Sequence, residues 1–203
     1  MAPETWLAFL FASAAMLAIP GPTILQVIGQ SLGAGRGRAL PLVAGVALGD
    51  LTAMTLSLAG LGTLLAASSL AFTLLKWAGA AYLIWLGVGL WRAPVAAAVA
   101  PLLSARRAFR DVYVVTALNP KSIAFFVAFV PQFLDGSRAF LPQAAILVAS
   151  FVTLGAANAL LYALLAGRMS GLVTRPRVRR GFNRLGGSLL VGAGLATAAM
   201  RRA

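Results

Sequence analysis

The feature that most constrains this chain is that long apolar stretches occupy almost all of it. Six stretches are long enough to cross a bilayer as helices, which needs about 20 residues each. Hydrophobic residues make up 61% of the 203 residues and charged residues only 10%, whereas a soluble domain has about 25% charged residues. The chain is therefore expected to be an integral membrane protein, because a soluble domain needs more polar surface and a disordered chain more charge.

The expected fold is all-α, because none of the stretches alternates polar and apolar residues as membrane strands do. The first stretch is expected to be retained, since its start holds Glu4 and none of the basic residues of a cleaved signal. The six predicted spans are Thr5–Ile28, Ala39–Leu64, Ala71–Trp91, Val112–Leu134, Pro142–Ala166 and Leu185–Met200.

Most of the 17 Lys and Arg residues lie in three of the predicted loops, and such basic loops mark the cytoplasmic side of a membrane. Both termini are therefore expected to face outward. The formal net charge of +13 would suggest nucleic-acid binding in a soluble protein, but here it indicates membrane topology. The basic loop residues are Arg36 and Arg38; Arg92, Arg106, Arg107 and Arg110; and Arg168, Arg175, Arg177, Arg179, Arg180 and Arg184.

The third and sixth spans resemble each other, since a constant offset places Gly79 on Gly186 and Gly87 on Gly194. This similarity predicts two three-span halves within one membrane domain, 1–203. Because three is an odd number, the halves insert with opposite orientation, as in the inverted repeats of many secondary transporters. Repeat one is expected at about 5–91, a cytoplasmic loop at about 92–111, and repeat two at about 112–203.

The first and fourth spans share a proline break, at Pro20-Gly21-Pro22 and at Asn119-Pro120-Lys121. Proline lacks the N–H that would bond to the residue four positions back, so the carbonyls of Met16, Ala18 and Thr116 are expected to need other partners. The segments that follow each break would offer positive helix ends to an anion. A simple packing kink at either break is the alternative interpretation.

Four spans place polar residues at one depth. At 1.5 Å per residue, Pro20, Pro120 and Asn158 lie about 12 Å from the inner boundary, Lys121 about 14 Å and Asp50 about 17 Å. The bilayer midplane is about 15 Å from that boundary. A charge there costs at least about 2.5–3.5 kcal/mol, so Asp50 and Lys121 are expected to face the bundle interior or a hydrated cavity.

Two interpretations of Asp50 and Lys121 remain open. In the first, Asp50 and Lys121 form a structural ion pair. In the second, they bind a zwitterion, and Asp50 binds its ammonium group while Lys121 binds its carboxylate. The two are compatible if the solute displaces an internal pair. In the second interpretation Asp50 could also exchange a proton and couple proton movement to export.

Other function classes fit less well. The chain has no Cys, no His and no phosphate-binding loop, which argues against a metal cage, an embedded enzyme and ATP hydrolysis. A purely structural subunit would not need charges at the midplane. A metal or inorganic-ion exporter of related architecture remains the alternative function. No cofactor and no nucleic-acid partner are expected.

Several motifs together resemble the LysE/RhtB family of amino-acid exporters along essentially the whole chain. The family pattern is similar to Pro20-Gly21-Pro22, to 45–50 ending in Asp50, to 118–126 with Asn119-Pro120-Lys121, and to 175–187. The matching positions are Pro20, Gly21, Pro22, Asp50, Asn119, Pro120, Lys121, Pro131 and Gln132. Asp111 departs from the pattern, where glycine is common, and a local ion pair with Arg107 or Arg110 is expected there.

The resemblance implies export of amino acids across the bacterial inner membrane, driven by the proton gradient. One Asp and one Lys suit a neutral zwitterion such as homoserine or threonine. The implied partners are the amino acid, protons and the lipid bilayer, and a homo-oligomer is compatible with this architecture. The candidate residues of the substrate and proton pathway are the two ionisable groups and their neighbours: Asp50, Lys121, Asn119, Pro20, Gly21, Pro22, Pro120, Asn158 and Gln132.

Overall fold

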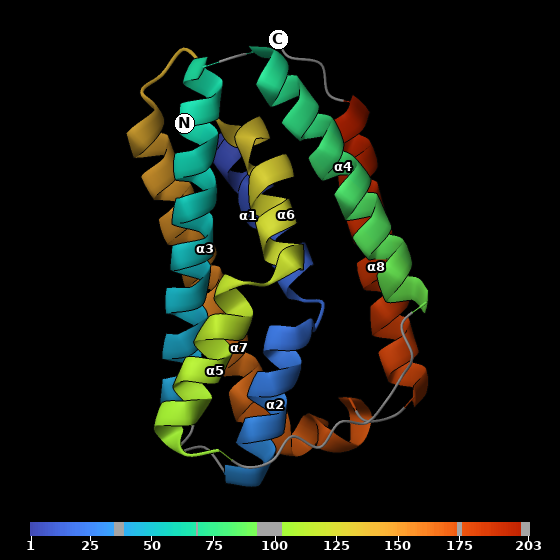
Figure 1. Cartoon of the computed structure of the whole chain (residues 1–203). Helices are drawn as coiled ribbons and strands as arrows, with labels where there is room; N and C mark the ends of the chain where they lie inside the picture. Colours follow the sequence, from blue (N-terminus) through green and yellow to red (C-terminus); the bar gives the residue numbers. More distant parts are fainter. Residues whose placement is uncertain (35–38, 68, 93–102, 174–175, 200–203) are drawn as a thin grey trace.

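The computed structural model describes the chain except for residues 35–38, 68, 93–102, 174–175 and 200–203. The described residues form eight α-helices and one short 3₁₀ helix, and no strand occurs among them. The expected all-α fold is confirmed. Figure 1 shows the helices standing roughly side by side as an elongated bundle.

Two of the expected spans are bent pairs of helices. Helix α1 (Pro3–Leu17) is followed by α2 (Pro22–Ala34) at a bend of 57°. Helix α5 (Ala105–Ala117) is followed by α6 (Pro120–Ala128) and the 3₁₀ helix η2 (Val130–Phe133) at a bend of 40°. Each second helix begins with proline at its first position, where the missing N–H costs little because that group has no intrahelical partner.

Each bent pair is followed in the chain by two further helices. After α1 and α2 come α3 (Ala39–Ala67) and α4 (Ser69–Arg92); after α5 and α6 come α7 (Phe140–Val173) and α8 (Pro176–Ala199). In Figure 1 the two bends lie at mid-height, with α1 and α6 in the upper half and α2 and α5 in the lower half. The two broken segments run in opposite directions through the bundle.

Two apolar clusters pack above and below the bends. The upper core is rich in aromatic rings, and the Phe126 and Phe151 rings meet edge to face with their centroids 4.8 Å apart. Its buried members are Phe9, Met16, Ala53, Met54, Leu58, Phe125, Phe126, Val130, Ala144, Leu147 and Phe151. The lower core is mostly aliphatic: Ile24, Val27, Ile28, Ala39, Leu42, Val46, Ala108, Val112, Ala159, Tyr162, Ala163 and Ala166.

Helices α4 and α8 pair closely along their length, beside the other helices (Figure 1). Glycine permits this approach, because a Cβ atom on Gly87 would lie 2.6 Å from the Gly187 carbonyl oxygen. A Cβ atom on Gly194 would likewise lie 2.7 Å from the Ala80 carbonyl oxygen. Small residues at such interfaces are typical of membrane helices. Leu83 and Leu190 then attach the pair to α6 through a small apolar cluster with Ala124 and Ala128.

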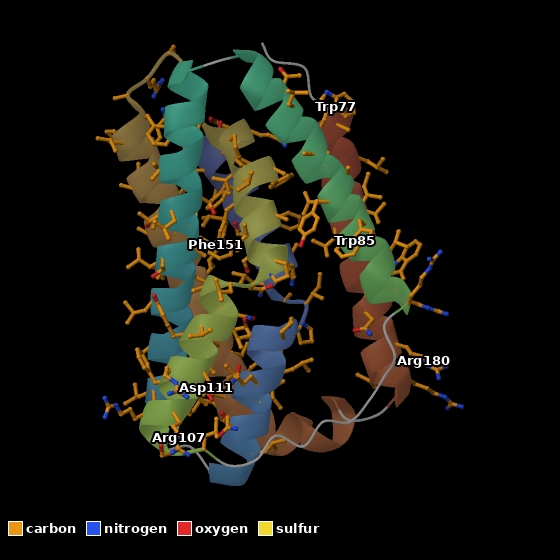
Figure 2. All side chains as sticks on the ribbon, viewed as in Figure 1. Trp77, Trp85, Arg107, Asp111, Phe151 and Arg180 are labelled. Atoms are coloured by element: carbon orange, nitrogen blue, oxygen red, sulfur yellow. The ribbon has the colours of Figure 1, made fainter. Side chains whose placement is uncertain are left out.

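Large apolar side chains also cover the outer surface of the molecule. Phe11 is 79% exposed, Leu40 78% and Leu141 76%, and Figure 2 shows Trp77 and Trp85 on the outside of α4. In the described part of the chain, two helices are long and apolar enough to cross a membrane, and four segments qualify if each bent pair counts as one. This finding agrees with a membrane protein, while the expected six spans stay a prediction.

Helices extend into the expected basic loops. Helix α5 begins at Ala105 instead of Val112, with the Ser104 hydroxyl accepting a hydrogen bond from the Arg107 N–H as its cap. Helix α7 continues to Val173, and α8 begins at Pro176 instead of Leu185. Arginine is a good helix former, so a basic stretch does not by itself end a helix. The charges at Arg36, Arg38 and Arg175 fall outside the described residues.

Candidate functional site

The two helix breaks meet around a cavity of about 30 Å³ near the middle of the bundle. A cavity of this size holds a water molecule or two and is too small for an amino acid. Five of the residues predicted from sequence line it, namely Gly21, Asp50, Asn119, Lys121 and Asn158. The other lining residues are Met16, Leu17, Ile19, Thr23, Ile24, Val46, Thr116, Ser122 and Gly155.

Lys121 reaches from the start of α6 to the end of α1. Its Nζ donates hydrogen bonds to the carbonyl oxygens of Met16, at 2.9 Å, and Ile19, at 3.1 Å. The Met16 carbonyl is the group whose helical partner Pro20 removes. A cation at the carboxyl end of a helix is also favoured by the helix dipole. Lys121 therefore stabilises the broken end of α1.

Two side chains of α7 donate hydrogen bonds to the carbonyls of the two residues between Met16 and Ile19. The Asn158 Nδ2 donates to the Leu17 oxygen at 3.0 Å, and the Tyr162 hydroxyl donates to the Ala18 oxygen at 2.8 Å. Four successive carbonyls of the α1 end are thus hydrogen-bonded by side chains of α6 and α7. We call these four carbonyls, Met16 to Ile19, the carbonyl end of α1.

At the second break the freed backbone groups find local partners. The Thr116 carbonyl accepts a hydrogen bond from the Asn119 N–H at 3.1 Å. The Asn119 Oδ1 in turn accepts one from the Lys121 N–H at 3.1 Å, which caps the start of α6. Asn119 thereby fixes the direction in which α6 leaves the break, and with it the position of Lys121.

Asp50 of α3 is the carboxylate of the cavity. The residue is only 3% exposed, and within the described residues its side chain accepts no hydrogen bond. It lies against Gly155 of α7, where a Cβ atom would stand 2.6 Å from its Oδ2. Gly155 thus leaves the space that the carboxylate occupies.

Asp50 and Lys121 line the same cavity and interact through their charges, but they do not form the ion pair that one interpretation of the sequence expects. The ion pairs among the described residues are Arg110 with Asp111, at 3.0 Å, and Arg138 with Asp135, at 3.1 Å. The physical reason is that the carbonyl end of α1 already holds the Lys121 ammonium. The Arg110–Asp111 contact confirms the local pair expected beside α5.

Hydroxyl groups that the sequence did not single out lie beside the charged pair. The Thr23 Oγ1 accepts hydrogen bonds from the Thr116 Oγ1 at 3.3 Å and the Asn119 Nδ2 at 3.4 Å, and all three residues are buried. Thr23 directly follows Pro22, and Thr116 stands four residues before Pro120. Polar residues flanking the two proline breaks were the signal that could have indicated them.

Four predicted residues do not line the cavity. Pro20, Pro22 and Pro120 belong to the breaks themselves and shape the backbone around it. Gln132 lies in η2, where its Nε2 donates to the Ala128 carbonyl at 3.1 Å. It stands eleven residues beyond Lys121, and α6 carries the chain away from the break by about 1.5 Å per residue.

A polar turn closes the upper end of the bundle between η2 and α7. The Asp135 carboxylate accepts hydrogen bonds from the Ser137 hydroxyl and N–H, at 2.6 and 2.9 Å, which lower the pKa of Asp135, and Arg138 adds to this effect. No group of three His, Cys, Asp or Glu side chains that could hold a metal ion occurs among the described residues.

The chain is similar to known proteins over nearly its whole length. The family model of the LysE type translocator matches residues 14–201. A homoserine/homoserine lactone efflux protein of Salmonella typhimurium is 38% identical over 200 residues, covering 96% of this chain and 97% of that protein.

Two further relatives extend the comparison. A membrane protein of Vibrio cholerae serotype O1 is 36% identical over 195 residues, 95% of each chain. A leucine efflux protein of Salmonella choleraesuis is 30% identical over 131 residues, 63% of this chain and 62% of that protein. No solved structure matches the chain significantly.

Proposed function

Because the chain belongs to the LysE type translocator family, whose members are transporters and not enzymes, we propose that it is a secondary transporter exporting small neutral amino acids. The observation that carries the proposal is the buried carboxylate of Asp50, which lines one cavity with the Lys121 ammonium and accepts no hydrogen bond from the described residues. A buried carboxylate without hydrogen bonds is costly in a membrane protein interior and indicates a binding partner that comes and goes.

A zwitterionic amino acid matches the two charges. Its ammonium group would bind the Asp50 carboxylate. Its carboxylate would bind the Lys121 ammonium, which has three N–H donors and uses two of them on the carbonyl end of α1. The names of two relatives, which refer to homoserine and leucine, support a neutral substrate of this size. Thr23, Thr116, Asn119 and Asn158 would contribute the remaining polar contacts.

Competition for Asp50 would couple export to protons. A carboxylate can hold a proton or pair with an ammonium group, but a protonated carboxyl loses the charge that attracts the ammonium. The site would bind the substrate from the cytoplasm and release it outside, where Asp50 would take up a proton. Release of that proton to the cytoplasm would let the proton gradient drive export. The same residue thus serves both ligands in turn.

The arrangement of the helices supports an alternating-access cycle. The cavity lies between the upper and lower cores, and its volume of about 30 Å³ requires the helices around it to move before an amino acid enters. We interpret α1 to α4 and α5 to α8 as two inverted halves that form six spans, since each has a broken segment followed by two helices. By the distribution of basic residues, the termini face the periplasm of a bacterial inner membrane.

Efflux from loaded cells tests this function. Cells that overproduce the protein are loaded with labelled homoserine, leucine, threonine, lysine or arginine, and loss of label is followed. Neutral amino acids should leave faster than from cells without the protein. Asp50→Asn and Lys121→Met should each lower efflux by about tenfold or more, since a hydrogen bond to a charged group contributes about 1.5–3 kcal/mol. Asp111→Asn, which alters only an exposed pair, serves as the control.

Two results would contradict the proposal. If none of the amino acids leaves the cells faster than the background, this substrate class is excluded. If the protein instead protects the same cells against metal salts, the ion exporter is favoured. Full efflux by both Asp50→Asn and Lys121→Met would leave the function standing but remove the proposed site.

A further inference from the structure

The carbonyl end of α1 presents backbone oxygens to a single positive charge. The Met16 and Ile19 oxygens both lie within 3.1 Å of the Lys121 Nζ. In transporters with broken helices, the carboxyl ends of half-helices and unwound carbonyls commonly coordinate free coupling cations such as Na⁺. Here the Lys121 ammonium group occupies the position at the carbonyl end of α1.

Asp50 brings a carboxyl group to the same cavity. It lines the cavity together with Met16, Ile19 and Lys121, is 3% exposed, and is close enough for its charge to act on that of Lys121. Carbonyl and carboxylate oxygens are the ligands that hard cations prefer. The oxygens around the Lys121 ammonium are therefore those of a cation-binding site.

We propose that the carbonyl end of α1, with the Asp50 carboxylate in the same cavity, is a monovalent-cation site whose occupant is the tethered ammonium of Lys121. The Lys121 side chain extends from α6, so the ammonium group that neutralises the broken end of α1 also links the two breaks. Wild-type protein consequently needs no free Na⁺ at this position. The inference concerns what holds the breaks together and stands whether or not the exported solute is an amino acid.

The surroundings of the lysine stem leave room for a free ion once the stem is removed. A Cβ atom on Gly21 would lie 3.8 Å from the Lys121 Cδ and 3.9 Å from its Nζ, so glycine leaves this side of the stem open. Truncation to alanine would join the vacated volume to the existing cavity of about 30 Å³. Methionine, in contrast, would refill most of that volume with an apolar chain and leave no place for an ion.

Thermal unfolding of purified protein in different chloride salts tests the site. Lys121→Ala is compared in sodium, lithium, methylammonium and choline chloride at one ionic strength, choline being too large for the cavity. A small cation should raise the apparent unfolding temperature of Lys121→Ala by at least about 2 °C over choline. Wild type, whose site is filled, and Lys121→Met, whose site is blocked, should show no such difference.

A second substitution locates the effect. In the double variant Asp50→Asn with Lys121→Ala, the cation-specific shift should disappear, because the carboxylate supplies the negative charge of the cavity. Equal unfolding temperatures for Lys121→Ala in all four salts would overturn the proposal. The proposal would also be overturned if sodium raised the unfolding temperature of wild type as much as that of Lys121→Ala, or if Lys121→Ala did not fold even in methylammonium chloride. Solute efflux by the wild type is measured separately, so its failure is distinguishable from each of these results.

Discussion

Asp50 is able to lie in the middle of the molecule because the residue opposite it has no side chain. Gly155 of α7 faces the carboxylate, and a Cβ atom there would stand 2.6 Å from Oδ2. Real Cβ atoms are not found so close to a neighbouring oxygen, so the carboxylate would have to turn away. The position of the charge therefore depends on one glycine in another helix.

Replacement of Gly155 tests this dependence. We expect Gly155→Ala to lower amino-acid efflux by about tenfold or more, because a small displacement of a binding group has effects of this size. Stability should not fall in parallel, since alanine favours a helix over glycine by about 1 kcal/mol. Gly192→Ala, on α8 with no atom within 4 Å of the added Cβ, is the matched control and should transport normally. Normal efflux by Gly155→Ala would mean that Asp50 is not the substrate ligand.

The sequence indicated which charged residues share a depth, but not how their neighbours are arranged. Asp50 and Lys121 stand out because charges are rare in apolar spans, and the structure places both at one cavity. Tyr162 could not be predicted, since a tyrosine in an apolar helix has many ordinary roles. Its hydroxyl acquires its role only when α7 packs against the carbonyl end of α1, and that contact is tertiary.

At the scale of elements, the two breaks follow from proline and the polar residues beside it. The prolines predicted both bends, and the structure has them at Ala18–Gly21 and Leu118–Asn119. Helices α5, α7 and α8 extend beyond the predicted spans, because the expectation equated basic residues with loops. Arg106, Arg107 and Arg110 instead lie on an amphipathic first part of α5, and Figure 2 shows Arg107 and Asp111 near its lower end.

The α4–α8 pair offers a test of helix packing that does not touch the site. We expect Gly87→Val to lower the apparent unfolding temperature by several degrees, because a Cβ atom there would lie 2.6 Å from the Gly187 oxygen. Overpacking of this kind costs about 1–3 kcal/mol, and each kcal/mol shifts the unfolding temperature by about 2–4 °C in a chain of this length.

The control for this substitution lies two residues further along the same helix. Gly89 is exposed, and an added Cβ would have no atom within 4 Å. Gly89→Val should unfold at the wild-type temperature when both variants are measured by thermal denaturation in the same detergent. Equal stability of the two variants would contradict the close contact between α4 and α8.

At the scale of the whole molecule, the site lies between two apolar cores of different character. The upper core is rich in phenylalanine rings, and the lower core is mostly aliphatic. The sequence predicted that polar groups share one depth, but it could not show that an apolar core packs on each side of that layer. The packing of each core depends on how side chains of four α-helices interlock, which periodicity does not encode.

Cysteine labelling tests the orientation of the molecule in the membrane, since the chain has no cysteine of its own. Gly136→Cys lies in the exposed turn at the end of the bundle that holds the N-terminus, and Arg180→Cys lies exposed on α8 toward the other end. We expect a membrane-impermeant maleimide to label Gly136→Cys in intact cells and Arg180→Cys only after permeabilisation. The reverse pattern would place the termini in the cytoplasm.

The central proposal is that a proton and the substrate's ammonium group bind the same carboxylate in turn. The most direct measurement is the affinity of the purified protein for homoserine, or for whichever amino acid the efflux screen selects, at a series of pH values. In the range where Asp50 gains its proton, wild-type affinity should fall by about tenfold per pH unit of acidification. Asp50→Asn should bind weakly at every pH. Wild-type affinity that is independent of pH, or a pH dependence that persists in Asp50→Asn, would contradict exchange at Asp50.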